Sequence, residues 1–197
     1  MGRTFARAVQ FIIVVGIGIM TGFSAAPQKG GIHRFDFNNA DYPSDCSKVY
    51  SNSGFPGVIR VSNGVWKHGS RDDAVFFGNN KPIYGDVSGD GREEAVVRTS
   101  CGLAVSTEAH DEIFVFGVGT LNPKLLAKLS ASDLGAPSHD FAFTFTDVQV
   151  KNGQLVVGYL TGGPRAQPTW EVTARFKLIG GRLVRTGSDK KPFNPQN

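Results

Sequence analysis

The sequence predicts an all-β protein, with antiparallel sheets joined by hairpins into a sandwich or a curved meander, and little helix outside its N-terminal segment. Its 197 residues include 25 glycines and 10 prolines spread along the chain, a distribution typical of short strands separated by tight turns. Apolar and polar residues alternate in several segments, as they do in strands with one buried face. Asn63-Gly64 and Asn152-Gly153 are dipeptides that favour two-residue type I′ hairpins.

The first 26 residues have the order of a secretory signal peptide. Arg3 and Arg7 precede the mostly apolar stretch "FIIVVGIGIMTGF", and the small residues of "SAAPQ" follow it. We expect the mature chain to begin near Ala25 or Pro27 and the protein to be exported, to the periplasm or the extracellular space. A retained anchor stays open as an alternative, because a backward extension of the apolar run approaches the ~20 residues of a membrane span. Contact with a membrane is expected only through such an uncleaved segment.

Residues 27–190 are expected to form a single β domain, since no repeat or linker interrupts them. The last ten residues, "SDKKPFNPQN", predict a frayed C-terminus, with a disordered tail at 191–197. Without Arg3 and Arg7 the chain has 19 basic and 17 acidic residues. This near balance, with no basic stripe interleaved with aromatic residues, argues against nucleic-acid binding.

The predicted strands begin at residues 31–37, where His33, Phe35 and Phe37 share one face. Strands follow on both sides of Asn63-Gly64 and at 72–78. In 94–101, one face holds alternate residues: Ala95, Val97, Thr99 and Cys101. The stretch 111–119 reads as another strand.

Residues 123–130 could begin a helix, with Asn122 as cap and Pro123 in the first position, but a strand is favoured. In 141–150 the apolar phase shifts after Phe145, which predicts a bulge or bend near Asp147. A strand at 155–160 follows Asn152-Gly153. The clearest alternation covers 170–178, and Gly180-Gly181 turns the chain into a last strand at 182–187.

The two cysteines, Cys46 and Cys101, predict one disulfide, because an even count in an exported protein favours pairing. Two buried free thiols remain the alternative.

The stretch "YGDVSGDGREEAVV" sets oxygen donors at alternate positions of a nine-residue loop. Asp86, Ser88, Asp90 and Glu94 occupy positions 1, 3, 5 and 9, and the glycine at position 6 permits a turn that directs the Arg92 carbonyl inward. Carboxylate, hydroxyl and carbonyl oxygens are the ligands that Ca²⁺ prefers. Position 12 is Val97, so the loop is not an EF-hand. A polar turn, in which the aspartates accept backbone N–H bonds, stays open as the alternative.

This stretch resembles the calcium loop of FG-GAP or VCBS repeats, of the form D-x-[DNS]-G-D-G-x-x-[DE]. The resemblance implies Asp86, Ser88, Asp90, the Arg92 carbonyl and Glu94 as ligands of a structural Ca²⁺. The chain departs from those families in having one copy of the motif and serine at position 3. The hairpin order also resembles small exported bacterial β-domain proteins of unassigned function.

Catalytic motifs are weak in this sequence. His110 lies among acids in "EAHDEI" and His139 precedes Asp140, and each could host acid–base chemistry. Polar turns before the apolar runs that follow are the preferred interpretation. Gly162, Gly163, Pro164 and Arg165 read as a hairpin loop before Trp170, and such loops also carry binding surfaces.

These observations favour an exported, non-enzymatic binding or interaction module, stabilised by one Ca²⁺ if the acidic loop binds metal, whose partner is an envelope protein or a glycan. An inhibitor or accessory subunit of another envelope protein is the alternative. A hydrolase using the surroundings of His110 or His139 is a third reading.

Overall fold

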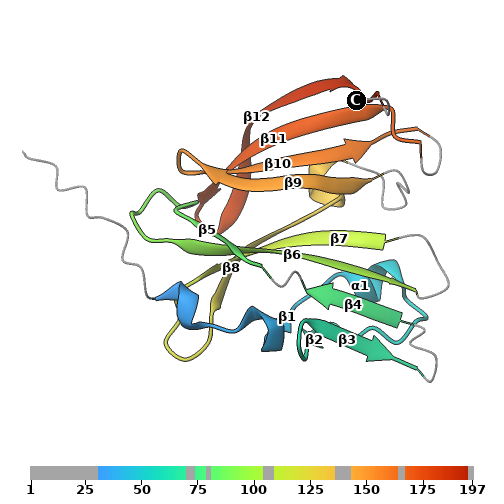
Figure 1. Cartoon of the computed structure of the whole chain (residues 1–197), viewed down its shortest axis with the longest axis vertical. Helices are drawn as coiled ribbons and strands as arrows, with labels where there is room; N and C mark the ends of the chain where they lie inside the picture. The colour runs from blue at the N-terminus through green and yellow to red at the C-terminus, as the bar shows by residue number, and fades with distance from the viewer. Residues whose placement is uncertain are drawn as a thin grey trace, which may run out of the picture.

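The computed structural model describes residues 31–69, 74–78, 81–103, 109–135, 143–163 and 167–194. The chain forms three layers, and the all-β prediction is confirmed (Figure 1). A six-stranded antiparallel sheet lies in the middle, a four-stranded antiparallel sheet covers one of its faces, and an irregular N-terminal layer covers the other. The predicted signal segment, 1–26, lies outside the described residues.

The middle sheet has the order β3-β4-β6-β7-β8, with β5 pairing the edge of β6 beside β4. Its strands are β3 (Val65–His68), β4 (Ala74–Gly78), β5 (Ile83–Gly85), β6 (Glu94–Leu103), β7 (Ala109–Gly117) and β8 (Lys124–Ser130). Strands β6 and β7 are buried on both faces, because alternate residues such as Val96 and Val97 belong to different cores. Strand β8 occupies residues 124–130, so the region that could have begun a helix is a strand, as favoured.

The four-stranded sheet follows the chain as a meander, in the order β12-β11-β10-β9. Its strands are β9 (Thr144–Lys151), β10 (Gln154–Thr161), β11 (Trp170–Ile179) and β12 (Arg182–Pro192), and η3 (Ser132–Leu134) lies between β8 and β9. Val172, Ala174 and Phe176 face the middle sheet, in the predicted alternation. The predicted bulge near Asp147 is confirmed, since the register shifts where Asp147 and Phe145 oppose Gly158 and Tyr159.

The N-terminal layer contains η1 (Ile32–Arg34), η2 (Phe37–Asn39), β1 (Asp41–Tyr42), α1 (Cys46–Val49) and β2 (Ile59–Arg60). The strand predicted at 31–37 is wrong, because two 3₁₀ turns occupy this region. Phe37 is nonetheless buried, and it packs on Phe116 with ring centroids 5.4 Å apart. Burial of apolar side chains thus holds the segment without a ladder of backbone bonds.

Hairpin turns occur where the sequence predicts them. Positive φ angles at Asn63 (50°) and Gly64 (78°), and at Asn152 (52°) and Gly153 (68°), are those of type I′ turns. Gly180-Gly181 has the same signature.

The predicted frayed C-terminus is wrong over its first half. Strand β12 pairs with β11 as far as Pro192, opposite Trp170, while residues 195–197 lie outside the described residues. Strand β12 is an edge strand, where lysines and a terminal proline are tolerated because one row of backbone groups needs no partner. In the part of the chain that the structure describes, no helix is long and apolar enough to cross a membrane.

Candidate functional site

The acidic loop, residues 86–94, joins β5 to β6 at the end of the middle sheet. The two strands pair from Gly85 opposite Glu94, so the loop is the closed end of a hairpin. Gly89 and Gly91 have φ angles of +77° and +84°, in the left-handed region. These two glycines let the backbone coil tightly enough for side chains on alternate positions to turn inward.

The loop brings three of the predicted ligands together. One carboxylate oxygen from each of Asp86, Asp90 and Glu94 lies within 4.8 Å of the other two. The Ser88 hydroxyl joins them, since its Oγ lies 3.3 Å from Asp86 Oδ1 and 3.1 Å from Glu94 Oε1. The guanidinium of Arg92 binds Asp90 at 2.5 Å, whereas the resemblance uses only the Arg92 carbonyl.

Backbone N–H groups also converge on the carboxylates. Asp86 accepts hydrogen bonds from the amides of Gly89 (2.5 Å) and Gly91 (2.9 Å), and Glu94 accepts from Val87 (2.7 Å) and Ser88 (3.1 Å). These bonds are the ones expected of the polar turn. They are compatible with a cation as well, because within the described residues Asp86 Oδ2 accepts only from the Gly91 amide and Glu94 Oε1 only from the Ser88 hydroxyl, so each of these oxygens keeps a lone pair.

The electrostatics of the loop are unbalanced. Glu94 is only 4% exposed, and burial raises its pKa, with the Asp90 charge acting in the same direction. Asp90 is exposed, and its hydrogen bond with Arg92 lowers its pKa. Arg92 is the one cationic side chain within the loop and lies on Asp90. A divalent cation among the three carboxylates would relieve the burial of negative charge at Glu94.

The donor set fits Ca²⁺ better than Mg²⁺ or a transition metal. Three carboxylates and one hydroxyl are hard oxygen donors, and Ca²⁺ accepts about six to eight of them in flexible geometry, with water completing the shell. Magnesium requires a nearly ideal octahedron. Asp86, Ser88, Asp90 and Glu94 are therefore the residues that would hold the ion.

The acidic loop borders a cavity of about 390 Å³, here called the loop-end cavity. The ends of the β7–β8 and β11–β12 hairpins supply its other walls, through residues that include Val118, Lys124, Leu126 and Leu178. His33 of the N-terminal layer also reaches this end, where its Nε2 lies 2.9 Å from Glu93 and its ring stacks on Tyr84 at 3.8 Å. Elements from all three layers thus meet beside the loop.

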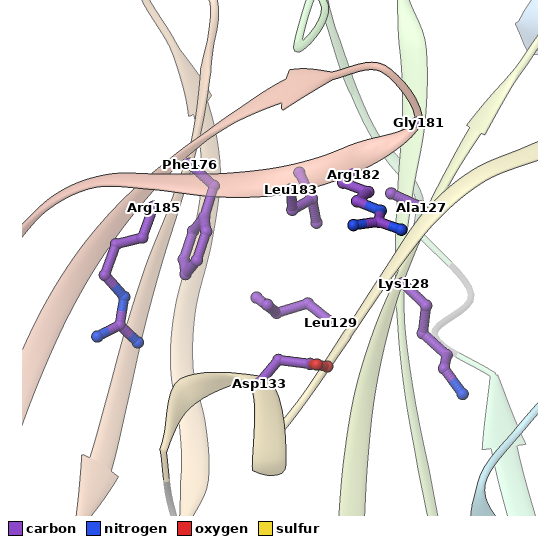
Figure 2. Close-up of a pocket in the computed structure, with 9 residues that line it drawn as sticks. All are labelled: Ala127, Lys128, Leu129, Asp133, Phe176, Gly181, Arg182, Leu183 and Arg185. Atoms are coloured by element: carbon purple, nitrogen blue, oxygen red, sulfur yellow. The ribbon is translucent and has the colours of Figure 1, made fainter.

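A second cavity, of about 350 Å³, opens between the two sheets where β8 and β12 approach each other (Figure 2). We name it the β8–β12 cavity. Leu129, Phe176 and Leu183 point into it, and Arg182, Arg185 and Asp133 surround it. No sequence motif marks this site, because its residues come from four separate elements, β8, η3, β11 and β12.

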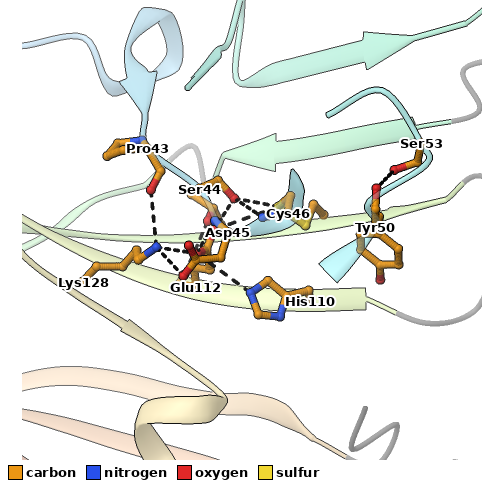
Figure 3. Close-up of a disulfide and its surroundings, with 11 residues drawn as sticks. Pro43, Ser44, Asp45, Cys46, Tyr50, Ser53, His110, Glu112 and Lys128 are labelled. Carbon is orange, nitrogen blue, oxygen red and sulfur yellow. Dashed lines mark hydrogen bonds and ion pairs between the residues drawn. A yellow bond between two sulfur atoms is a disulfide. The ribbon is translucent and has the colours of Figure 1, made fainter. Parts of the chain in front are cut away.

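The Cys46–Cys101 disulfide is present and ties α1 of the N-terminal layer to β6, with a Cα–Cα distance of 6.2 Å (Figure 3). Next to it lies a buried polar cluster centred on Glu112, whose side chain is fully buried. Ser44 donates its hydroxyl to Glu112, the Asp45 amide donates at 3.0 Å, and the Lys128 ammonium lies 3.3 Å away. The cluster therefore joins the N-terminal layer to β7 and β8.

Burial alone would raise the pKa of Glu112, but the surrounding polar and charged groups outweigh it. His110, the Ser44 hydroxyl, the Asp45 amide and Lys128 together hold this pKa below its ordinary value. Glu112 is therefore a carboxylate near neutral pH. Removal of one partner from such a buried carboxylate is strongly destabilising, because it leaves a buried charge uncompensated.

His110 lies in β7 and not in the predicted polar turn. Its ring faces Glu112, with Nε2 at 3.9 Å from Oε1, which is an ion-pair distance but too long for a hydrogen bond. Ser44 is bound to Glu112 and to Cys46. The geometry is that of a structural network, in which the serine hydroxyl serves a carboxylate and not an imidazole base. His139 lies outside the described residues.

Sequence reasoning missed Ser44, Asp45, Glu112 and Lys128 as a group. Ser44 and Glu112 are 68 residues apart, so no local motif could join them. A usable signal existed within β7, because Glu112 directly precedes the apolar run "IFVF" and shares a face with His110 at a spacing of two.

The predicted binding loop is described only in part. Gly162 and Gly163 have φ angles of +71° and +95°, and the Gly162 carbonyl accepts the Thr169 amide at 2.9 Å. Trp170 lies on β11, where the Lys190 ammonium is 4.1 Å from its ring centroid. Pro164 and Arg165 lie outside the described residues.

Three comparisons with known proteins place this geometry in no family. No family model matches the sequence, and no curated protein and no solved structure is significantly similar to it.

Proposed function

We propose that the protein is an exported, non-enzymatic binding module of sandwich form, in which the acidic loop holds one Ca²⁺ that stabilises the fold. The convergence of the Asp86, Asp90 and Glu94 carboxylates within 4.8 Å is the observation that carries the metal assignment. The Cys46–Cys101 bond supports export, because disulfides persist in oxidising compartments. The signal-like N-terminal sequence points the same way.

The binding role rests on the end of the molecule that carries the acidic loop. There the loop-end cavity lies between hairpin ends, and loops held by a rigid sheet scaffold are common binding surfaces. Leu121 in the β7–β8 turn is 85% exposed and Val118 is 45% exposed. These exposed apolar side chains favour a protein partner at this end, so an accessory subunit or inhibitor of an envelope protein is the second candidate function.

A calcium titration tests the metal assignment. Lacking a bidentate ligand at position 12, the loop should bind with a dissociation constant of ~0.1–1 mM. At the tighter end, about 1 mM Ca²⁺ would stabilise the fold by about 1.4 kcal/mol. That corresponds to a melting shift of roughly 3–5 °C.

The melt of chelator-treated protein is followed with and without about 5 mM Ca²⁺, a concentration well above the expected dissociation constant. Asp86→Ala and Asp90→Asn should abolish the shift, whereas Asp189→Asn on β12 removes an equal charge outside the loop and should keep it. If wild type responds no more than the two loop variants, the loop is a polar turn and the metal assignment is wrong.

Export and binding need separate measurements. The N-terminal peptide and intact mass of exported protein should place the start of the mature chain near Ala25 or Pro27. Pull-down from the native envelope fraction should recover a partner with wild type and lose it with Leu121→Asp.

A further inference from the structure

The β8–β12 cavity is lined on one side by β12, whose pairing with β11 is irregular at this point. Leu183 lies opposite Leu178 and faces the core. Two residues further along the same face of β12, Arg185 lies opposite Phe176, where an apolar residue would continue the alternation of buried and exposed residues. The register shift at this point makes Thr186 an extra residue in β12. Bulges re-aim side chains and are common beside functional sites.

The floor of the cavity is apolar. Leu129 and Phe176 are each 2% exposed, and together with Leu183 they point into the space between β8 and β12 (Figure 2). The volume of about 350 Å³ is at the small end of the range for ligand sites, which are mostly apolar with a few placed polar groups. The ligand that this cavity can take has a short hydrocarbon body.

The rim of the cavity is cationic. Arg185 is fixed, because it donates to the Leu134 carbonyl at 3.2 Å and its guanidinium lies 5.7 Å from the Phe176 ring centroid. Arg182 is exposed and lies beside Ala127, and its guanidinium has no hydrogen bond or ion pair with the described part of the chain. Its five N–H donors are thus free for an anion.

The other charged groups of the rim do not neutralise the positive charge of Arg182 and Arg185. Lys128 points away from the cavity, toward Asp45 and Glu112 on the other face of β8. Asp133 directs one carboxylate oxygen to the amide and hydroxyl of Ser130, at 2.7 and 2.8 Å. The cavity therefore combines an apolar floor with two guanidinium groups and one carboxylate that is already hydrogen-bonded.

We propose that the β8–β12 cavity binds a small organic carboxylate with an apolar body, whose hydrocarbon part contacts Leu129, Leu183 and Phe176 and whose carboxylate binds Arg182. Guanidinium and carboxylate groups match in a two-bonded geometry, which fixes the orientation of the anion. The site is separate from the acidic loop and does not depend on calcium.

Octanoate is the probe, and ¹⁵N–¹H correlation spectra of the full exported chain report where it binds. Saturable shifts are expected for amides of residues 127–129 and 182–185. Arg182→Gln should weaken octanoate binding roughly tenfold or more, since it removes a hydrogen bond between two charged groups. Lys177→Gln, which removes a charge from the opposite face of β11, should leave the affinity unchanged. Octanol should bind more weakly than octanoate and respond equally to both variants.

Two results overturn the proposal. One is a spectrum in which octanoate, at concentrations below micelle formation, leaves those amides unshifted while the protein remains folded. The other is an octanoate affinity that Arg182→Gln and Lys177→Gln change to the same extent, which would show adsorption by general charge.

Discussion

The Lys128 ammonium lies 3.3 Å from a carboxylate oxygen of Glu112, whose side chain has no solvent exposure. The same ammonium lies 2.6 Å from Asp45 in the N-terminal layer. One cation on β8 thus compensates two carboxylates at the junction of two layers.

Lys128→Met should destabilise the protein by about 3–5 kcal/mol, because it leaves the buried Glu112 carboxylate without its cation. The free energy of unfolding in urea measures this. Lys177→Met is the matched control and should change it by less than about 0.5 kcal/mol. The double variant Glu112→Gln/Lys128→Met should recover much of the loss. Equal losses in the single and double variants would contradict the ion-pair explanation.

Low pH should weaken the contribution of Glu112 to the stability of the fold. Its folded-state pKa is held below the ordinary value of 4.5, so its contribution to stability is fully present above 4.5 and is lost as the pH falls through the folded-state value. The difference in unfolding free energy between wild type and Glu112→Gln should be constant near neutral pH and shrink below 4.5. Urea unfolding of both proteins at a series of pH values from neutral to below 4.5 measures this difference. A difference that grows as the pH falls would mean that the folded-state pKa of Glu112 is raised and not lowered.

Glu94→Gln should separate the two possible roles of the acidic loop. Burial raises the pKa of Glu94, so this carboxylate contributes less to stability as the pH rises through its folded-state value. In chelator near neutral pH, Glu94→Gln should melt no lower than wild type, since an amide oxygen can still accept the Val87 and Ser88 amides. Added calcium should raise the melting temperature of wild type but not that of Glu94→Gln. A variant that melts well below wild type in chelator would mean that the charge itself holds the turn.

The disulfide should stabilise the N-terminal layer most. Closing a loop of 55 residues contributes about 4 kcal/mol on the chain-entropy model. In the double variant Cys46→Ala/Cys101→Ala the free energy of unfolding should fall by up to this amount. Reductant should lower the stability of wild type but not of the variant. Hydrogen exchange should show residues 31–62 opening before β6 and β7. Uniform acceleration across the middle sheet would instead indicate that the layers unfold together.

Gly85→Ala should strain the contact between β5 and β9. A Cβ at Gly85 would lie 2.7 Å from Val150 Cγ1 and 2.8 Å from its Cβ. Over-packing of this kind costs about 1–3 kcal/mol. Thermal melts should show the loss, and Gly85→Ala/Val150→Ala should reverse part of it. Gly57→Ala, with no atom within 4 Å of the added methyl, is the control and should be nearly neutral.

The sequence predicts the hairpins and long strands well because their causes are local. Asn63-Gly64, Asn152-Gly153 and Gly180-Gly181 adopt positive φ angles wherever the chain needs a tight turn. Alternation from Trp170 to Leu178 reports directly which side of β11 meets the core. The acidic loop follows from the same locality, because all its oxygen donors lie within nine residues.

The failures have long-range causes. Residues 31–37 alternate like a strand, but no strand among the described residues pairs with them, and contacts such as His33 on Tyr84 hold them instead. The end of β12 is charged and proline-containing, yet β11 offers it a partner as far as Trp170. The Glu112 cluster depends on how β7, β8 and the N-terminal layer pack, which no local pattern encodes.

The double burial of β6 and β7 has an evolutionary consequence. A substitution in either strand is constrained on one side by the sandwich core or on the other by the N-terminal layer, so few positions there can change freely. The exposed residues 89–92 of the acidic loop, the exposed residues of the β7–β8 turn and the outer edge of β12 are under weaker packing constraint and can diverge more quickly. Distant relatives of this chain should therefore share the apolar pattern of residues 94–117 long after they have lost the loop chemistry that distinguishes one ligand from another.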